Sequence, residues 1–545
     1  MSIPFKQIED SFIPTKDGKA DCSEHGMIAT QSPQATEAGI EILKAGGNAV
    51  DAAVAAAFAL GVTEPQGSGL GGQTMMLIHD SVRTIAIDGS SRAPSLAHSS
   101  GIYEEDRSLG YRATTVPSTP ATLSYIQKRY GKLTWEQILE PSIHHAENGY
   151  SISELQSRLQ KREKENFEKV PSQSGSRYFL NEGDAFKPNE LFRQPDLAAL
   201  LRRLSEKGIE EFYRGEIARQ IDADMREHGG LLRYDDLTLI PFPIEREPLS
   251  RPFRGLDIVT MPPPGSGRSL LFALLMLDLI PMDQDIQDEA TRYLLFIHIL
   301  RKTLLERSDM PYDANFFPQI ANESDMLDPI FAHEVLTEIL KDVDKFIIPF
   351  LPSVDELSGE TTHLSVIDKN GMAVSLTQSI ERVYGSKAAA QGLGFLYNNY
   401  MFDFDFKVPA HPFYLRPNAT PWATVAPTLI FNDNNLWMVL GSPGSERIIS
   451  TLVLFLKRVC DEGLPIDQAV NAPRIHCSLG GRVSLEVNRF AQSLVPFFKH
   501  KGFRIDERED FSFYLGSIQC VLKRSDNQGF QGVADTRRDG TAGGY

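Results

Sequence analysis

The chain has few cysteines, and none of them lie close together. Its four cysteines, Cys22, Cys460, Cys477 and Cys520, are far apart, and no CxxC pair occurs. This spacing argues against a zinc ribbon, a redox dithiol or a disulfide-stapled secreted fold.

Long apolar runs are also missing. The first 25 residues are rich in Lys, Asp and Glu and contain no apolar core of a signal peptide. The most apolar stretch, residues 49–62, carries Asp51 and is shorter than the roughly 20 residues that a membrane span needs. We therefore expect a cytoplasmic protein with no membrane partner.

Basic residues are outnumbered by acidic ones. Lys and Arg number 55 and Asp and Glu number 72, so the formal net charge is −17. A surface this acidic repels phosphate backbones, and we expect no nucleic-acid partner. The hydrophobic share of 41% and the charged share of 23% are near the globular average, which excludes wholesale disorder.

Three common catalytic or cofactor motifs are absent or incomplete. Residues 67–72 spell GxGxxG, but they follow a predicted helix and precede a predicted strand, which is the reverse of a dinucleotide-binding site. His333-Glu334 starts an HExxH motif, yet Thr337 stands where the second zinc ligand is needed. No GxSxG nucleophile elbow occurs.

Hydrophobic spacing predicts a layered α/β or α+β fold. The region from 134 to 279 reads as mostly helical, and the period changes to two after residue 358, where Asn370-Gly371 predicts a hairpin. The other predicted elements are a helix from Ser32-Pro33, a buried helix from Asn48, and strands at 74–78, 428–431 and 436–440.

Thr361 and Thr362 stand just before this hairpin, after the short segment Ser358-Gly359-Glu360. A threonine hydroxyl is a weak nucleophile unless a base takes its proton, and its own α-amine can be that base if the chain is cut just before it. By itself, Thr-Thr before a strand indicates only good β-propensity.

The surrounding residues resemble the γ-glutamyltransferase family of N-terminal nucleophile hydrolases and transferases. The central match is ETTHLSVIDKNGMAVS at 360–375, which is similar to the family segment whose first Thr is the nucleophile. Further matches, in order, are GGNAVDAAVA at 46–55, GSGLGG at 67–72, MPPP at 261–264, NNYMFDF at 398–404, APT at 426–428 and GSPGSERI at 441–448.

The resemblance implies an α+β fold, a four-layer αββα sandwich made as a proenzyme. Cleavage at Glu360–Thr361 would give fragments 1–360 and 361–545, which together form one domain and a heterodimer. Thr361 Oγ would attack first its own preceding carbonyl and then a small-molecule amide. No metal and no organic cofactor is implied.

The resemblance also implies roles for residues around the nucleophile. The backbone N–H groups of Gly444 and Ser445 would stabilise the oxyanion. Ser379 occupies the position of the hydroxyl that binds the nucleophile, and Asp403 matches the carboxylate that holds the substrate's α-ammonium.

The sequence departs from the family pattern at the substrate contacts. The family places an Arg two residues after an Asp to clamp the α-carboxylate, whereas Ser90 follows Asp88 here. A hydroxyl cannot replace a bidentate guanidinium without losing charge-assisted hydrogen bonds. We expect Arg92, on the same face of a strand, to substitute in part, and Arg112 is a second candidate.

Four further positions in or near the expected substrate pocket differ as well. Ala423 and Thr424 stand in place of paired serines, Glu381 in place of an Asn, and Tyr400 in place of another polar residue. Glu381 would either keep the Thr361 amine charged and weaken it as a base, or bind a cationic group of the substrate.

Three hypotheses follow. The first is a self-processing γ-glutamyltransferase-like enzyme that hydrolyses γ-glutamyl amides such as glutathione and also transfers the glutamyl group to amino acids. The second is an amidohydrolase or acylase of the same family that acts on another small carboxylated amide, of the glutaryl or oxamate type. The third is a catalytically silent scaffold, for which the changed Glu381 is the one supporting feature.

Overall fold

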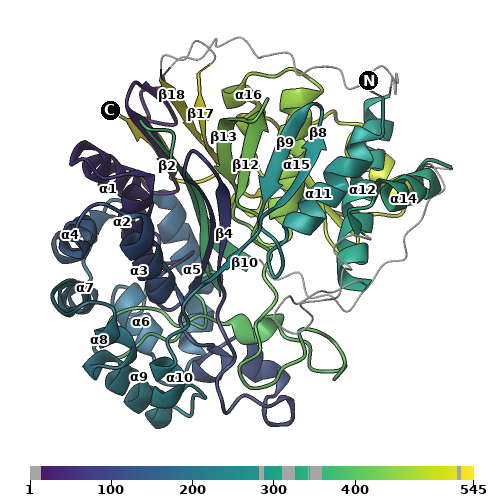
Figure 1. The fold of residues 1–545 in the computed structure, drawn as a ribbon. Coiled ribbons are helices and arrows are strands. Elements are labelled where there is room, and N and C mark those ends of the chain that lie inside the picture. The colour runs from purple at the N-terminus through teal and green to yellow at the C-terminus, as the bar shows by residue number, and fades with distance from the viewer. Residues whose placement is uncertain (1–13, 282–287, 310–325, 342, 344–358, 525–528) are drawn as a thin grey trace.

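Two stacked β-sheets lie between two groups of helices in the computed structural model of the chain (Figure 1). The structure describes residues 14–281, 288–309, 326–341, 343, 359–524 and 529–545. The order of layers is helices, sheet, sheet, helices, so the predicted four-layer αββα sandwich is confirmed.

The first sheet has seven strands and is called the β10 sheet here. Its central neighbours β10 and β11 are antiparallel, and both are buried along nearly their whole length. The strand order is β19 (Thr541–Gly544), β2 (Gly26–Thr30), β10 (Gly359–Asp368), β11 (Ala373–Arg382), β3 (Gln73–His79), β4 (Thr84–Gly89) and β7 (Ile244–Arg246).

The second sheet, the β13 sheet, also has seven strands, and each of its pairs is antiparallel. The order is β1 (Ala20–Ser23), β18 (Phe530–Ala534), β17 (Gln519–Lys523), β13 (Asn435–Gly441), β12 (Thr428–Asn432), β9 (Leu256–Thr260) and β8 (Leu249–Phe253). Smaller sheets are formed by β14 (Ile475–Cys477), β15 (Arg482–Glu486) and β16 (Arg504–Arg508), and by β5 (Tyr150–Ser151) and β6 (Leu191–Phe192).

Helices α1 to α10 lie on the side of the β10 sheet, and α11 to α17 lie on the side of the β13 sheet (Figure 1). The first group is α1 (Pro33–Lys44), α2 (Ala49–Thr63), α3 (Thr119–Tyr130), α4 (Trp135–Asn148), α5 (Glu154–Glu168), α6 (Ser174–Phe179), α7 (Pro195–Lys207), α8 (Glu210–Tyr213), α9 (Glu216–Glu227) and α10 (Tyr234–Thr238). The second group is α11 (Gly267–Asp278), α12 (Glu289–Asp309), α14 (Pro329–Lys341), α15 (Arg447–Cys460), α16 (Ile466–Asn471) and α17 (Leu494–His500).

The inner faces of the two sheets meet in a core of their own. Met75 and Leu77 of β3 belong to the same buried cluster as Leu429 of β12 and Val439 of β13. Since the outer face of each sheet is covered by helices, its central strands are buried on both faces. This is why residues 361–367 of β10 include no Asp, Glu, Lys or Arg, instead of alternating with solvent-facing charges.

Helix α2 is tied to the hairpin that follows Thr361. Asn48 and Asp51 cap the helix reciprocally, each accepting a backbone N–H of the other at 3.0 Å. Asp368, at the end of β10, accepts the N–H of Ala49 at 3.0 Å. The capped N-terminus of α2 is therefore docked on the β10–β11 turn.

The predicted elements are largely confirmed, with two differences. The hairpin at residues 369–372 contains a single positive φ, at Gly371, so it is not the two-residue turn in which Asn370 also adopts one. The segment predicted as mostly helical also contains strands β5 to β9. These strands escaped detection because each is at most five residues long. In addition, β7 and β9 pair with the distant strands β4 and β12, whereas β8 forms a hairpin with β9.

Among the helices that the structure describes, none combines the length and apolarity needed to cross a lipid bilayer.

Candidate active site

Thr361 lies at an irregularity in the pairing of β10 with β11. Glu360 pairs with Glu381 and Thr362 pairs with Gln378, so two β11 residues face the single residue Thr361. Such bulges occur next to active sites, where they redirect a side chain. The sequence analysis placed Thr361 just before the hairpin, but Glu360 and Thr361 are both buried within strand β10. Ser358 lies outside the described residues.

Ser379 touches the bond that precedes Thr361. Its Oγ donates a hydrogen bond of 2.6 Å to the carbonyl oxygen of Glu360 and accepts one of 2.9 Å from the N–H of Glu381. Thr361 Oγ1 is 3.5 Å from the same hydroxyl, which is longer than an ordinary hydroxyl hydrogen bond. Ser379 is thus placed to polarise the Glu360 carbonyl while remaining beside Thr361, the candidate nucleophile.

A buried arginine holds the Glu360 side chain. Arg538 Nη1 donates to Glu360 Oε1 and, at 3.3 Å, to the carbonyl oxygen of Thr361. Glu360 Oε1 also accepts the N–H of Thr361 at 3.0 Å. Burial raises the pKa of nearby Glu64 to about 8 although Arg538 lies 3.6 Å away. These contacts fix both ends of the Glu360–Thr361 bond.

The turn before α15 presents its backbone beside the same strand. Gly444 and Ser445 have φ angles of 118° and 54°, and neither N–H donates to an acceptor among the described residues. A Cβ on Gly359 would lie 2.7 Å from Cβ of Ser445, and Arg447 donates to the Gly359 carbonyl at 3.1 Å. The N-terminal end of α15 therefore lies against Gly359, which precedes Thr361 by two residues. N–H groups at this place can stabilise developing negative charge.

A polar cavity of about 420 Å³ opens next to this turn. It brings together four of the residues predicted from the sequence: Glu381, Asp403, Thr424 and Ser445. Its other lining residues are Glu104, Arg107, Leu304, Arg307, Ser308, Arg382, Phe402, Lys407, Trp422, Glu446, Arg447, Ser478, Leu479 and Tyr514.

Two carboxyl groups face each other in this cavity. Burial raises the pKa of both Glu381 and Asp403, and the neighbouring Glu381 charge raises the pKa of Asp403 further. The charges of Arg382, Arg307 and Arg447 act in the opposite direction. Two like charges this close favour sharing one proton, with Asp403 as the protonated partner.

Most arginines that line the cavity donate hydrogen bonds to backbone carbonyls or stack on aromatic rings. Arg107 donates to the carbonyl of Phe404 at 3.0 Å and lies 2.8 Å from Glu104. Arg382 stacks over the Phe402 ring, with its Cζ 3.8 Å from the ring centroid. Within an acidic chain, this gives one cavity a concentration of cationic groups suited to carboxylate ligands.

The remaining predicted residues lie around or away from the cavity. Tyr400, on the 3₁₀ turn η4 (Tyr400–Asp403), is buried, and burial next to Glu381 raises the pKa of its phenol well above the ordinary value. Ala423 is buried in the inter-sheet core. Arg92 is not among the described residues that line the cavity, and Ser90 Oγ donates to Asp88. Substrate-binding roles for these residues stay predictions.

Arg112 and His363 are occupied by structural contacts. Arg112 pairs with Asp106 at 3.0 Å. The ring of His363, two residues after Thr361, hydrogen-bonds with Thr377 at 2.9 Å and Ser365 at 3.1 Å, and burial lowers its pKa to about 3. His363 is therefore neutral near pH 7 and is not positioned as the base for Thr361.

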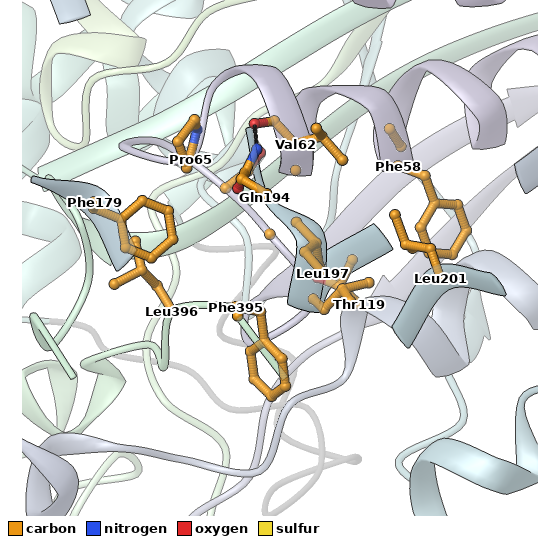
Figure 2. Close-up of a pocket in the computed structure, with 16 residues that line it drawn as sticks. Phe58, Val62, Pro65, Thr119, Phe179, Gln194, Leu197, Leu201, Phe395 and Leu396 are labelled. Atoms are coloured by element: carbon orange, nitrogen blue, oxygen red, sulfur yellow. Dashed lines mark hydrogen bonds between the residues drawn. The ribbon is translucent and has the colours of Figure 1, made fainter. Parts of the chain in front are cut away.

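A second, closed gap lies among the helices that cover the β10 sheet (Figure 2). Phe58 and Val62 of α2 and Leu197 and Leu201 of α7 line it, and Gln194 Nε2 donates to the carbonyl of Val62 at 2.8 Å. Its volume of about 10 Å³ is at or below what one water molecule needs. It is a packing gap and does not bind substrate.

Comparison with known proteins agrees with this geometry. A family model described as Gamma-glutamyltranspeptidase matches residues 35–545. The chain belongs to the gamma-glutamyltranspeptidase family. A glutathione hydrolase proenzyme of Escherichia coli (strain K12) is 31% identical over 98% of this chain and 94% of its own length. That of Pseudomonas sp. (strain A14) is 32% identical over 83% of this chain and 82% of its own length.

Structural similarity extends over the whole chain. The crystal structure of a cephalosporin acylase from Bacillus halodurans is 26% identical, with a TM-score of 0.85 over 100% of this chain and 99% of that one. Membership of this family makes the chain an N-terminal nucleophile hydrolase and a γ-glutamyltransferase-like enzyme.

Sequence reasoning missed several groups around the nucleophile and the cavity. Arg447 lies inside the quoted segment 441–448, and Arg382 directly follows Glu381, so both were within its reach. Arg538 and Glu64 lie far in sequence from Glu360 and Thr361, and Arg307 lies far in sequence from Glu381 and Asp403, so no local pattern indicates these contacts.

Proposed function

We propose that the chain cuts itself between Glu360 and Thr361 and that the two fragments, 1–360 and 361–545, remain together as the active enzyme. The observation that carries this proposal is the hydrogen bond of 2.6 Å from Ser379 to the Glu360 carbonyl, beside the Thr361 hydroxyl. A polarised carbonyl and an adjacent hydroxyl are two of the groups that the first attack requires.

In the maturation step, Thr361 Oγ bonds to the carbonyl carbon of Glu360. The carbon–nitrogen bond breaks, and the hydroxyl proton ends on the nitrogen, which becomes a free amine. Water then hydrolyses the resulting ester, giving a Glu360 carboxylate and restoring the Thr361 hydroxyl. Ser379 stabilises the oxyanion of the first intermediate because it already donates to that oxygen.

Maturation also supplies a path to the nucleophile. In the intact chain Thr361 is 4% exposed and does not line the cavity, whereas Gly359 lies against Ser445 and Glu381 at the cavity wall. Displacement of the freed end at Glu360 would join Thr361 to the cavity.

The mature enzyme would then hydrolyse γ-glutamyl amides such as glutathione. The Thr361 amine takes the hydroxyl proton, Oγ attacks the amide carbonyl, and the N–H groups of Gly444 and Ser445 stabilise the oxyanion. The proton passes to the leaving amine, and water or an acceptor amino acid resolves the acyl-enzyme. Asp403, paired with Glu381, would hold the α-ammonium of the glutamyl group.

A second candidate function is that of an acylase acting on a carboxylated amide that lacks the α-amino group. The Ser in place of the clamp Arg at position 90 and the similarity to a cephalosporin acylase over the whole chain favour it. Relatives named as glutathione hydrolases favour the first function. A cytoplasmic location stays a prediction from the sequence.

The deciding experiment has two stages. Denaturing mass spectrometry of the purified protein should show two polypeptides, the smaller beginning at Thr361, whereas a whole 60.7-kDa chain after long incubation would favour the silent scaffold. Initial rates with γ-glutamyl-p-nitroanilide and glutaryl-p-nitroanilide then separate the two enzymes. Equal or faster cleavage of the glutaryl compound would overturn the γ-glutamyl assignment.

A further inference from the structure

We propose that Arg307 is the residue that binds the carboxylate of the substrate's acyl group, in place of the arginine that the family pattern puts at position 90. This inference rests on the proposed function, since it assigns a ligand group to the same cavity. It names the substrate class as amides whose acyl part carries a free carboxylate.

Arg307 reaches the cavity from the last turn of α12. The side chain lies at the cavity wall although only 8% of the residue is exposed. Its Nη2 donates to the carbonyl oxygen of Ala423 at 2.8 Å, and its Cζ lies 4.4 Å from the centroid of the Trp422 ring. These two contacts hold the guanidinium plane in one orientation.

Arg307 lies beside a segment that the family pattern places at the substrate pocket. Ala423 and Thr424 stand in this segment in place of paired serines. The Arg307 guanidinium donates to the backbone carbonyl of Ala423, and Thr424 lines the same cavity as Arg307. Of the two hydroxyls the chain keeps the one at Thr424, and Arg307 adds a positive charge to the cavity.

The cavity also holds negatively charged groups that can bind the substrate's ammonium group. Arg307 and the carboxyl pair Glu381–Asp403 line one cavity, and the charge of Arg307 opposes the rise of the Asp403 pKa. Burial lowers the pKa of Arg307 to about 10, so the guanidinium is charged near pH 7. A carboxylate on Arg307 and an ammonium on the carboxyl pair would fix an α-amino acid head group in one orientation.

The other arginines in the cavity are engaged differently. Arg447 donates to the carbonyls of Gly359 and Tyr514, and Arg107 is bound to Glu104 and to backbone carbonyls. Arg382 stacks over the Phe402 ring. Among the described residues, Arg307 donates a single hydrogen bond, to Ala423. The guanidinium thus retains donors in the planar, forked arrangement that matches a carboxylate.

Three p-nitroanilides test this assignment. The γ-glutamyl compound carries both charged groups, the glutaryl compound carries the carboxylate only, and the 4-aminobutanoyl compound carries the ammonium only. For the wild-type enzyme, we expect kcat/KM for the γ-glutamyl compound to exceed that for 4-aminobutanoyl by about 100-fold, since a charge-assisted bidentate pair is lost.

In Arg307→Met, this ratio should fall to within about threefold of one, mainly through KM, while self-cleavage continues. In Arg307→Lys, which keeps the charge but not the fork, the ratio should take an intermediate value of about tenfold. The fraction of cleaved chain reports folding, and Arg307→Lys provides the measurement if Arg307→Met does not fold.

The rival clamp is Arg92, tested by Arg92→Met. A ratio that stays near 100-fold in both Arg307 variants, or one that collapses in Arg92→Met instead, overturns the proposal. Absence of self-cleavage in the wild type would overturn the proposed function itself. A preference for the glutaryl compound would support the acylase, and the ratio of glutaryl to butanoyl p-nitroanilide would then test Arg307 in the same way.

Discussion

The two regions that meet beside Ser445 have different characters. At the end of the β10–β11 hairpin, Thr361 and Ser379 match the family pattern, are buried, and lie in hydrogen-bond networks with Glu360 and Arg538. The cavity next to it departs from the pattern at Glu381 and Thr424, and arginines from several elements line it.

The difference reflects what each region must do. Bond cleavage by Thr361 needs a few atoms within hydrogen-bond distance, so a change of residue there removes the reaction. A binding cavity tolerates exchange, since a carboxylate can be held by a guanidinium from any element that reaches it. We therefore expect substitutions at the hairpin to abolish chemistry and substitutions in the cavity to alter substrate choice.

The largest effect is expected from Thr361→Ala. Without the hydroxyl, neither attack is possible, so the chain should stay whole at 60.7 kDa, with amide hydrolysis below detection. Mass spectrometry measures self-cleavage, and release of p-nitroaniline from a γ-glutamyl-p-nitroanilide measures amide hydrolysis. Thr361→Ser, which keeps a hydroxyl, is the matched control and should still cleave, more slowly. Cleavage of the alanine variant at the same bond would show that another nucleophile acts.

Ser379→Ala should come next. Loss of the donor to the Glu360 carbonyl removes stabilisation of the first oxyanion, and the rate of self-cleavage should fall about 100-fold. The rate of self-cleavage is measured by following freshly purified proenzyme over time on denaturing gels. Ser379→Thr restores a hydroxyl and should recover most of the rate. An unchanged rate of self-cleavage in Ser379→Ala would show that Ser379 does not polarise the Glu360 carbonyl.

In the cavity, Glu381→Asn should move the pH dependence without abolishing turnover. Protonation of the carboxyl pair weakens its attraction for an ammonium, so kcat/KM for γ-glutamyl-p-nitroanilide falls as the pH drops through the raised pKa values. The neutral amide removes the like charge beside Asp403, lowers the Asp403 pKa, and shifts the acid limb to lower pH.

The pH profile of kcat/KM from pH 5 to 9 checks this shift. Glu104→Gln serves as the matched control, because Glu104 lines the same cavity but pairs with Arg107. An acid limb that moves equally in both variants would mean that net cavity charge, and not the Glu381–Asp403 pair, sets the profile.

The smallest effect is expected from Ser445→Gly. Ser445 has a φ of 54°, which disfavours a side chain, so glycine relieves strain that partly offsets its greater unfolded-state entropy. The free energy of unfolding should change by less than about 1 kcal/mol. Urea titration in a Thr361→Ala background measures it without mixed cleavage states. Turnover in the cleaving chain should stay within twofold, and a tenfold loss would assign a role to the hydroxyl.

Sequence patterns predicted much of the layered fold. Helix α2 could be identified from the Asn48 cap and its apolar run, and the hairpin from Asn370-Gly371, because capping and turn chemistry are local. Strands β7 and β9 could not be identified, because they pair with the distant strands β4 and β12, and β8 is a five-residue strand that pairs with β9.

The same distinction between local signals and contacts of distant segments applies to the candidate site. The sequence by itself determined the candidates for the nucleophile, its hydroxyl partner and the oxyanion turn, because each belongs to a contiguous motif whose backbone geometry is local. Only the tertiary structure decided which charges share a cavity: Arg307 from α12, Arg382 from β11 and Asp403 from η4 converge there. That convergence depends on how the layers pack, which no short segment of the chain encodes.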